Sequence, residues 1–493
     1  MAFEGVRVTR RGFIALSGVA FAALAGVRLP GAKAAPGSAT INGYVSRPDL
    51  NPPVVAVDVP ASGTAQGSIF LAPFDINAAA GAYQATPNSQ SHSGPLLVDN
   101  RGEPVWFLPL GSTTAMDVRM QTYQGRRVLT WYEGTVLGPY GGSWVIFDPT
   151  YHEVARVQAG RGRHGDLHEL LLTPQDTALI TIYREIATPA VPRLVTGIVQ
   201  EIDVASGRVL FEWRSNEHVG VDESYIPQVS AAGNVDYFHL NSIDVDTDGH
   251  LLVSARNTST IYKIDRKSGE VLWRLGGMKS DFAVEPAASF GFQHDVRRRP
   301  DGTITMFDNN AAVPTAQTSS RGLRIKLDLA AKRASFVREY LAPVPRTGWA
   351  MGNLQQLDDG GVMVGWGTDG SVTEFDQAGR VRFDARFADG SVSYRAFRFE
   401  LDAQPKGRPA TIVVRNPDGS LTLYVSWNGA TGVAKWQLVA GPSADRMKPV
   451  RTQRRTGFET AILLPVTSGY VSVVALDAQG KQLRAAAPTP IQA

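Results

Sequence analysis

The chain has 493 residues, of which 43% are hydrophobic, and a formal net charge of +3. Glycine (49) and proline (30) are frequent, and the segments between them are rich in valine, isoleucine, tryptophan and tyrosine, a composition typical of strands joined by turns. The absence of cysteine excludes disulfides, thiolate metal sites and cysteine nucleophiles. Any chemistry must therefore use oxygen and nitrogen groups.

The N-terminal residues 1–34 have the features of an export signal. Arg10 and Arg11 belong to a twin-arginine pattern, an uncharged run follows over 12–27, and Ala32-Lys33-Ala34 fits cleavage before Ala35. The uncharged run is shorter than the ~20 residues that span a bilayer. We expect export by the twin-arginine machinery to the periplasm, cell envelope or exterior, without a stable membrane span in the mature chain. A retained N-terminal anchor is the less favoured alternative.

Much of the positive charge belongs to this signal. Residues 1–34 contain five basic residues and one acidic residue, a net charge of +4, which leaves the rest of the chain near −1. The basic isoelectric point of about 9.0 is therefore no argument for nucleic-acid binding, and we expect none.

A repeat determines the predicted fold. Residues 35–67 form an expected N-terminal arm, and from residue 68 onward a strand ending in aspartate recurs at intervals of 48 to 63 residues. A second hairpin alternates with it and has Asp-Gly turns at 248–249, 301–302 and 359–360. Two hairpins in each of six periods predict an all-β, six-bladed β-propeller over residues 68–401. Two packed β-sandwiches are the alternative, but they would not explain the regular spacing.

The pattern changes in residues 402–493. Short apolar strands and a tryptophan, Trp427, predict a small C-terminal β-sandwich of the immunoglobulin or fibronectin type III kind. Two basic segments are interpreted as solvated: a loop at residues 451–455 and a sheet edge at residues 297–299.

Three histidines occupy equivalent places in the repeat. His168, His239 and His294 lie 8, 9 and 7 residues before the aspartate of the following turn. In a propeller these positions converge on the central channel. Asn241 follows His239 by two residues and would share its side of the strand, and Arg256 ends the next strand.

Two further residues are weaker candidates for substrate contact. Asn353 lies six residues before Asp359 and repeats the register, and His164 lies in a Gly-Arg-rich segment close to His168. Imidazoles, an amide and a guanidinium together suit an anion with tetrahedral oxygens. Two alternatives remain open: a divalent metal held by the three histidines, and a non-catalytic exported propeller that binds anions.

Four segments resemble the bacterial arylsulfotransferases that do not use phosphoadenosine phosphosulfate. They are DLHELLLTPQDTALITIY, FHLNSIDVD, LLVSARNTSTIYKIDRKSGEVLWRLGG and QHDVRRRPDGTITMFDN, and the resemblance covers residues 65 to 400. It implies a six-bladed propeller that moves a sulfuryl group from an aryl sulfate ester to a phenol by a ping-pong mechanism, without a cofactor. The lack of a cysteine pair and the C-terminal rather than N-terminal β domain indicate a divergent branch. A homo-oligomer is compatible with the sequence.

The resemblance also implies roles for individual residues. His294 corresponds to the family's nucleophile and would carry the sulfuryl group as a sulfohistidine. His168, His239, Asn241 and Arg256 correspond to residues that bind the sulfate oxygens and handle the phenolic proton. No residue is assigned to a metal.

Overall fold

The computed structural model describes residues 42–75, 92–135, 141–226, 229–230, 233–310 and 319–491. The export signal predicted at residues 1–34 and the first residues of the predicted arm lie outside this part of the chain. The described residues form strands and a few single turns of 3-10 helix, so the all-β prediction is confirmed. They include no helix with the length and apolar character needed to cross a membrane.

Between residues 68 and 399 the described strands form six sheets that each contain four antiparallel strands. In five of these sheets the four strands follow one another in the chain, and short turns connect many of them. The sheets are β2 (Ser68–Leu71), β4 (Leu96–Val98) and β5 (Pro104–Phe107) with β29 (Phe397–Phe399); β6 (Thr114–Tyr123), β7 (Arg126–Gly134), β8 (Gly142–Phe147) and β9 (Glu153–Val157); β10 (Leu170–Leu172), β11 (Thr177–Ile186), β12 (Leu194–Asp203) and β13 (Val209–Arg214); β15 (Leu240–Val245), β16 (Leu251–Ala255), β17 (Thr260–Ile264) and β18 (Val271–Gly276); β20 (His294–Arg298), β21 (Thr303–Asp308), β22 (Arg321–Asp328) and β23 (Arg333–Tyr340); and β24 (Asn353–Gln356), β25 (Val362–Gly365), β26 (Ser371–Phe375) and β27 (Val381–Phe387).

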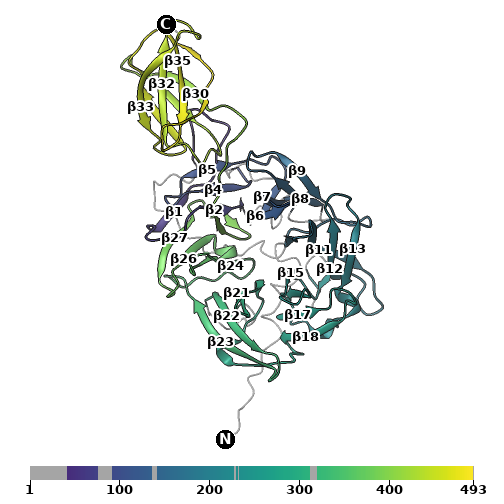
Figure 1. Cartoon of the computed structure of the whole chain (residues 1–493). Coiled ribbons are helices and arrows are strands. Elements are labelled where there is room, and N and C mark those ends of the chain that lie inside the picture. Colours follow the sequence, from purple (N-terminus) through teal and green to yellow (C-terminus); the bar gives the residue numbers. More distant parts are fainter. Residues whose placement is uncertain are drawn as a thin grey trace.

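Figure 1 shows the six sheets arranged around a common centre. The strands β6, β15 and β24 lie on the inner side, and β9, β13, β18 and β23 lie on the outer side. Three shorter strands extend the sheets: β1 (Val55–Val59) of the arm pairs with β27, β14 (Val235–Asp236) with β12, and β19 (Ala283–Val284) with β23. β3 (Pro73–Phe74) and β28 (Val392–Ser393) form a separate two-stranded sheet. The 3-10 turns are η1 (Ser215–Glu217), η2 (Val221–Glu223), η3 (Pro286–Ala288) and η4 (Gly367–Asp369).

The first and last strands of this arrangement belong to the same sheet. Ser68 of β2 is opposite Phe399 of β29, and Phe70 is opposite Phe397. The side chain of Asn353 adds a second link, since its Nδ2 donates to the carbonyl of Ala396 at 2.8 Å and its Oδ1 accepts from the amide of Ala396 at 2.9 Å. A segment more than 300 residues downstream therefore completes the first sheet.

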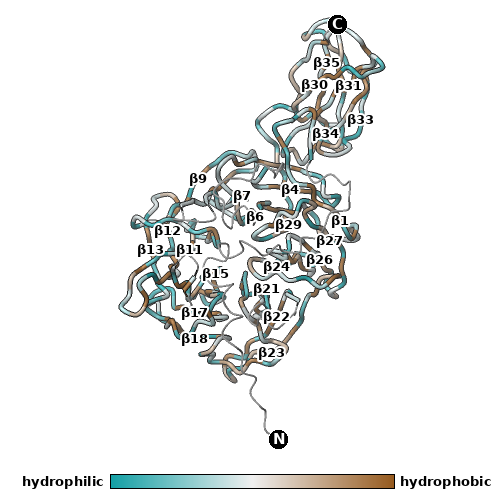
Figure 2. The backbone as a smooth tube through the Cα atoms, turned by 180° about the vertical axis from the view of Figure 1, so that it is seen from behind, coloured by the Kyte–Doolittle hydropathy of each residue, from teal (hydrophilic) through white to brown (hydrophobic). Residues whose placement is uncertain are grey.

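Neighbouring sheets share their apolar cores. One core combines Trp144 and Ile146 of β8 with Leu170 of β10 and Ile180 of β11, and all four side chains are fully buried. The core between the next two sheets is built in the same way, from β11 and β12 on one side and β15 to β17 on the other. Burying a large apolar side chain contributes about 1.5–3 kcal/mol, so these shared cores stabilise the contact between sheets. Figure 2 shows the same sheets from behind.

A buried network of ion pairs crosses the centre. Arg395 contacts three carboxylates from different sheets: Asp117 of β6 at 3.1 Å, Glu169 before β10 at 3.1 Å, and Asp295 of β20 at 3.5 Å. Two more guanidinium groups contact Glu169, those of Arg119 at 2.5 Å and Arg297 at 2.6 Å. The three positive and three negative charges balance, which makes their burial tolerable.

The network changes the protonation equilibria of its members. Burial alone would raise the pKa of Glu169, but Arg297, Arg395 and Arg119 outweigh it and lower the pKa to about 2. Burial opposes the charge of Arg395, yet Asp117 and Glu169 hold its pKa well above the usual value. The expectation of a solvated edge at residues 297–299 is wrong, because β20 is an inner strand and only 11% of the Arg297 side chain is exposed.

Residues beyond 402 form two sheets around their own core. β30 (Ala410–Arg415), β31 (Leu421–Ser426) and β34 (Glu459–Leu463) make one sheet, and β33 (Lys448–Arg454), β32 (Lys435–Gly441), β35 (Gly469–Leu476), β36 (Gln482–Ala485) and β37 (Thr489–Ile491) make the other. Leu423, Ile462, Trp436 and Val473 meet between them. The loop predicted for residues 451–455 is wrong, because residues 451–454 belong to strand β33.

This C-terminal unit contacts the first two sheets of the ring. The amide of Asn428 forms two hydrogen bonds with the backbone of Phe107 in β5, at 2.8 and 2.9 Å. The hydroxyl of Tyr151 donates to the carbonyl of Gly429 at 2.9 Å. Figure 1 shows the unit beside β4 and β5, and Figure 2 shows it beside β4, in both views apart from the centre of the ring.

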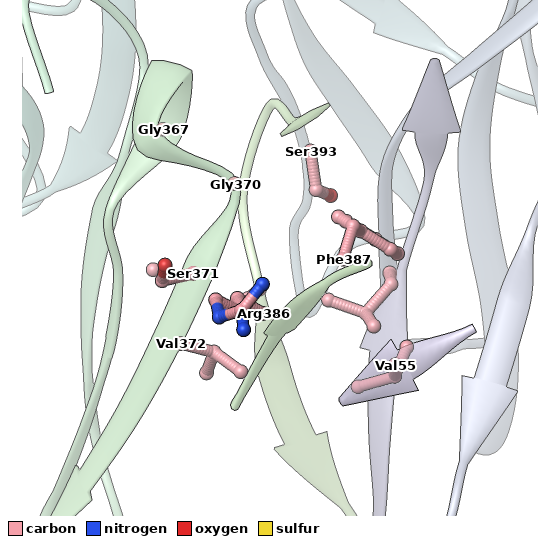
Figure 3. A pocket seen from close by; sticks show the side chains of 11 residues that line it. Val55, Gly367, Gly370, Ser371, Val372, Arg386, Phe387 and Ser393 are labelled. Atoms are coloured by element: carbon pink, nitrogen blue, oxygen red, sulfur yellow. The ribbon is translucent and has the colours of Figure 1, made fainter. Parts of the chain in front are cut away.

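A small void lies where the arm meets the last sheet (Figure 3). Val55 of β1, Leu71 of β2 and Val372 and Phe387 of the β26–β27 hairpin line it. Its volume is about 10 Å³, which is room for one water at most. The void is therefore a detail of packing and not a ligand site.

The central network leads to a stability prediction. Arg395→Met removes the cation shared by three buried carboxylates, and leaving buried charges uncompensated typically costs about 3–5 kcal/mol. We expect the free energy of unfolding, measured by chemical denaturation, to fall by that amount. Arg380→Met is the matched control, because it breaks the ion pair of Arg380 with Asp376, in which 82% of the arginine side chain is exposed. Exposed pairs contribute about 0–1 kcal/mol. Equal effects of the two substitutions would contradict the role given to the network.

Candidate active site

The three predicted histidines lie close together at the starts of inner strands. His168 precedes β10, His239 precedes β15, and His294 begins β20. The ring centroids of His168 and His239 are 5.1 Å apart, and the rings are nearly perpendicular. Tyr394 joins this pair to His294, with its centroid 5.5 Å from His168 and 6.5 Å from His294. The histidines are buried, with 9%, 9% and 1% of their surfaces exposed.

Two of the histidines are oriented by carboxylates. The Nδ1 atom of His168 is 2.5 Å from Asp166 Oδ1, and that of His239 is 2.5 Å from Asp236 Oδ2. A carboxylate oxygen accepts hydrogen bonds, so each Nδ1 is the donor and Nε2 is the ring nitrogen that is not used in this contact. The same arrangement orients general bases in hydrolases.

The surroundings of His239 change the pKa of its imidazole. Burial lowers its pKa, and the neighbouring Asp236 only partly offsets that effect. The residue adopts a left-handed backbone conformation, with φ at 55°, where the chain turns into β15.

The sequence predicted neither Asp166 nor Asp236. The available signal was an aspartate two or three residues before a histidine, in DLH and DYFH.

His294 is held in one tautomer by Asn309. The Nδ2 of Asn309 donates to the carbonyls of Gly348 and Met351, at 2.5 and 3.0 Å, so its Oδ1 must face the histidine. That oxygen lies 2.7 Å from His294 Nδ1, which therefore donates. The Nε2 atom is left unprotonated and accepts a 3.3 Å hydrogen bond from the amide of Met351.

The pKa of His294 is consistent with this tautomer. Burial lowers it well below the usual value for histidine, and the positive charge of Arg256 lowers it further. The ring is therefore neutral near pH 7 and has a lone pair on Nε2. This is the form in which an imidazole acts as a nucleophile.

Arg256 is a buried cation without an acidic partner. Its guanidinium donates to Asn257 Oδ1 at 2.8 Å and to the carbonyl of Trp349 at 3.3 Å, and it stacks on Phe292 with 4.5 Å between the Arg256 Cζ and the ring centroid. Among the described residues no carboxylate lies within ion-pair distance, and its Nε has no hydrogen-bond partner. Burial lowers its pKa to about 10, so it stays charged at pH 7. A buried cation with no carboxylate in contact favours the binding of an anion.

Asn241 and Tyr394 complete the group. Asn241 is fully buried and donates from Nδ2 to the carbonyl of Gln293 at 2.7 Å, while its Oδ1 has no partner among the described residues. The Tyr394 hydroxyl donates to the backbone carbonyl of Asn241 at 3.3 Å, and burial raises its pKa well above the usual value. The sequence did not indicate Tyr394, because it follows the last repeat and is not part of a hairpin motif.

The structure does not bring the two weaker candidates into this group. His164 is exposed in the segment between β9 and β10. Both polar atoms of the Asn353 amide are hydrogen-bonded to Ala396, which gives this residue a structural contact. Within the described ranges no cluster of three histidine, aspartate or glutamate side chains has an arrangement suited to a metal ion.

Solved structures with similarity to this chain share little of its sequence. A protein of unknown function from Bacteroides caccae is 13% identical with a TM-score of 0.40, and the match covers 68% of this chain and 100% of that one. The periplasmic gluconolactonase PpgL of Pseudomonas aeruginosa is 11% identical with a TM-score of 0.34, over 81% and 99% of the chains. An inactive virginiamycin B lyase from Staphylococcus aureus is 8% identical with a TM-score of 0.33, over 76% and 97%. No curated protein sequence matches.

The family comparison is more informative. The family model for arylsulfotransferase (ASST) matches residues 119–388, which is more than half of the chain. The match includes His168, His239, Asn241, Arg256 and His294, the residues that meet at the inner strands. The chain belongs to the arylsulfotransferase family, whose chemistry is sulfuryl transfer.

Proposed function

We propose that this protein is an exported six-bladed β-propeller enzyme that transfers a sulfuryl group from an aryl sulfate ester to a phenol through a sulfohistidine at His294. The observation that carries the proposal is the unpaired guanidinium of Arg256, buried beside a neutral His294. A cation placed there without a counter-ion supplies the charge that a sulfate ester needs, and the imidazole supplies the nucleophile.

In the first half-reaction the aryl sulfate binds with its anionic oxygens toward Arg256 and the remaining N–H of Asn241. The lone pair on His294 Nε2 attacks sulfur, an N–S bond forms, and the bond from sulfur to the aryl oxygen breaks. The departing aryl oxide takes a proton from the imidazolium of His239 or His168. Binding of the anionic ester favours this imidazolium, because negative charge raises the pKa of a nearby imidazole.

In the second half-reaction the acceptor phenol replaces the first product. The same imidazole, now neutral, takes the phenolic proton at Nε2 while Asp236 or Asp166 stabilises the imidazolium that forms. The phenol oxygen attacks sulfur, the N–S bond breaks, and His294 returns to its neutral form. The proton released to the first product is thus recovered from the acceptor.

The contact from the Met351 amide to His294 Nε2 describes the enzyme at rest. A lone pair that accepts a 3.3 Å hydrogen bond is weakly engaged, and attack on sulfur replaces that bond with N–S bonding. Met351 has a left-handed backbone conformation, with φ at 63°, which directs its amide toward the ring.

We assign the C-terminal unit to an immunoglobulin- or fibronectin-like sandwich that does not contribute to the site.

The nucleophile can be tested by substitution. His294→Ala removes the lone pair on which both half-reactions depend, so we expect no acceptor-dependent release of chromophore from a chromogenic aryl sulfate. His152→Ala, which changes an exposed histidine on the outer part of the ring, is the control and should keep the wild-type rate. A His294→Ala enzyme with near wild-type turnover would exclude the sulfohistidine route.

Asn309 can be tested as a positioning residue. Asn309→Ala removes the acceptor that fixes the His294 tautomer, and we expect kcat to fall on the order of tenfold or more with little change in KM. The hydrogen bond to Asn309 supports the imidazolium of His294, so its loss should also move the acid limb of the rate profile to lower pH. Asn310→Ala is the neighbouring control. Wild-type kcat in the Asn309 variant would contradict the positioning role.

The pH dependence of the wild-type enzyme follows from the lowered pKa of His294. A lowered pKa keeps the ring neutral and nucleophilic as the pH falls through the usual histidine range. We expect the acid limb of kcat/KM to have its midpoint below pH 6.5, measured with an aryl sulfate whose ester stays ionised throughout. A midpoint at or above pH 6.5 would show that His294 is not held neutral by its surroundings.

A further inference from the structure

The charge of the chain is divided between its two parts. Residues 402–493 contain eleven lysines and arginines and five acidic residues, a net charge of +6. Residues 35–401 have a net charge of −7. The near-neutral total after the predicted signal therefore conceals a strongly basic C-terminal unit, and such an asymmetry indicates an acidic partner.

Much of this positive charge lies on one edge of the unit. β33 is the outer strand of its sheet, and six of its seven residues are exposed. No acidic residue occurs between 446 and 458. The cations on and beside the strand are Lys435, Arg446, Lys448, Arg451 and Arg454, and none of them pairs with a carboxylate among the described residues.

The arrangement is unfavourable without a counter-anion. Lys435 of β32 lies directly opposite Arg454 of β33 in the sheet register. Like charges in directly opposed positions destabilise a sheet. In the ring, by contrast, exposed arginines such as Arg380 and Arg193 have acidic partners. The five cations of the C-terminal edge therefore differ from these two arginines, because none of them has an acidic partner among the described residues.

The shape of the edge restricts the partner. β33 is an extended row about 20 Å long at 3.3 Å per residue. Pro449 lies on the edge and has no backbone N–H, which disfavours the addition of a strand from another protein. Val450 is the one large apolar side chain of the strand that is strongly exposed, so the edge offers neither an apolar anchor for a bilayer nor an aromatic platform for nucleic-acid bases.

We propose that the β33 edge binds an extended anionic polymer of the cell envelope whose repeating units carry phosphate. A polymer lying along the edge would contact Arg454 and Lys435 on one face of the sheet and Lys448 and Arg451 on the other. These contacts would hold the exported enzyme at the envelope. This binding depends on the proposed export for its biological setting, and it does not depend on sulfuryl transfer.

The test uses the full chain from residue 35 to 493 and immobilised poly(glycerol phosphate) as the probe. The variant combines Lys435→Gln, Lys448→Gln and Arg454→Gln, and it keeps Arg451, whose guanidinium donates to the carbonyl of Leu463. The control removes three exposed cations of the ring, with Arg126→Gln, Arg127→Gln and Arg208→Gln.

We expect the wild-type chain and the control to bind at low salt and to dissociate as salt rises. The β33 variant should bind at least tenfold more weakly, with the slope of log K against log salt reduced by about two. A protein with fewer cations at the edge displaces fewer counterions from the polymer when it binds. The unfolding midpoint and the rate of aryl sulfate turnover are measured for all three proteins. An Arg454→Gln single variant replaces the triple variant if the latter unfolds early.

Several results would overturn the proposal. They are no binding of the wild-type chain at low salt, unchanged binding of the β33 variant, and an equal loss in the ring control. Vesicles of anionic phospholipid and a DNA duplex are measured in parallel, and tighter binding to either would assign the edge to that partner instead. Because binding and turnover are separate measurements, failure of the transferase assay would leave this test valid.

Discussion

The ion pairs of Arg395 are the interaction on which the arrangement of this protein depends. The guanidinium lies at the centre of the ring and contacts carboxylates that come from β6, the start of β10 and β20. It also donates to the backbone carbonyl of Asn241 at 3.1 Å. One buried cation therefore fixes the relative positions of several inner strands and of a residue in the active site.

Two buried arginines have different roles, one in holding the inner strands together and one in the candidate active site. Arg395 is surrounded by three carboxylates, and its charge is compensated within the fold. Arg256 instead donates to a side-chain amide oxygen and a backbone carbonyl, and no carboxylate is in contact with it among the described residues. The first arginine contributes to a rigid centre, and the second leaves a positive charge available to a ligand. Preorganised charge of this kind stabilises a transition state without reorganisation during the reaction.

The sequence predicted the features that repeat. Hairpins at the Asp-Gly turns of residues 248–249, 301–302 and 359–360 are present as β15–β16, β20–β21 and β24–β25. The shared register also grouped His168, His239 and His294, because equivalent positions in repeated sheets face the same centre. Strand and turn patterns are local, so one sequence is enough to recognise them.

Long-range partners could not be predicted in this way. Asn309 and Tyr394 act on His294 and His168 from distant segments, and no periodicity links them. Asn353 shared the register of the histidines, but its amide is hydrogen-bonded to Ala396. Residues 297–299 resembled a solvated edge because three arginines in a row are usually exposed, and only the placement of Glu169 and Asp246 against Arg297 and Arg298 explains their burial. Contacts between residues so far apart in the sequence can be identified only from the positions of the sheets around the centre.

The central claim is that His294 carries the sulfuryl group between donor and acceptor. The most direct test is intact-mass measurement after mixing the enzyme with an aryl sulfate in the absence of phenol, followed by peptide mapping. The account predicts a stoichiometric gain of one sulfuryl group, located on His294 and lost when phenol is added. Chromophore release without any adduct, or an adduct on another residue, would contradict it.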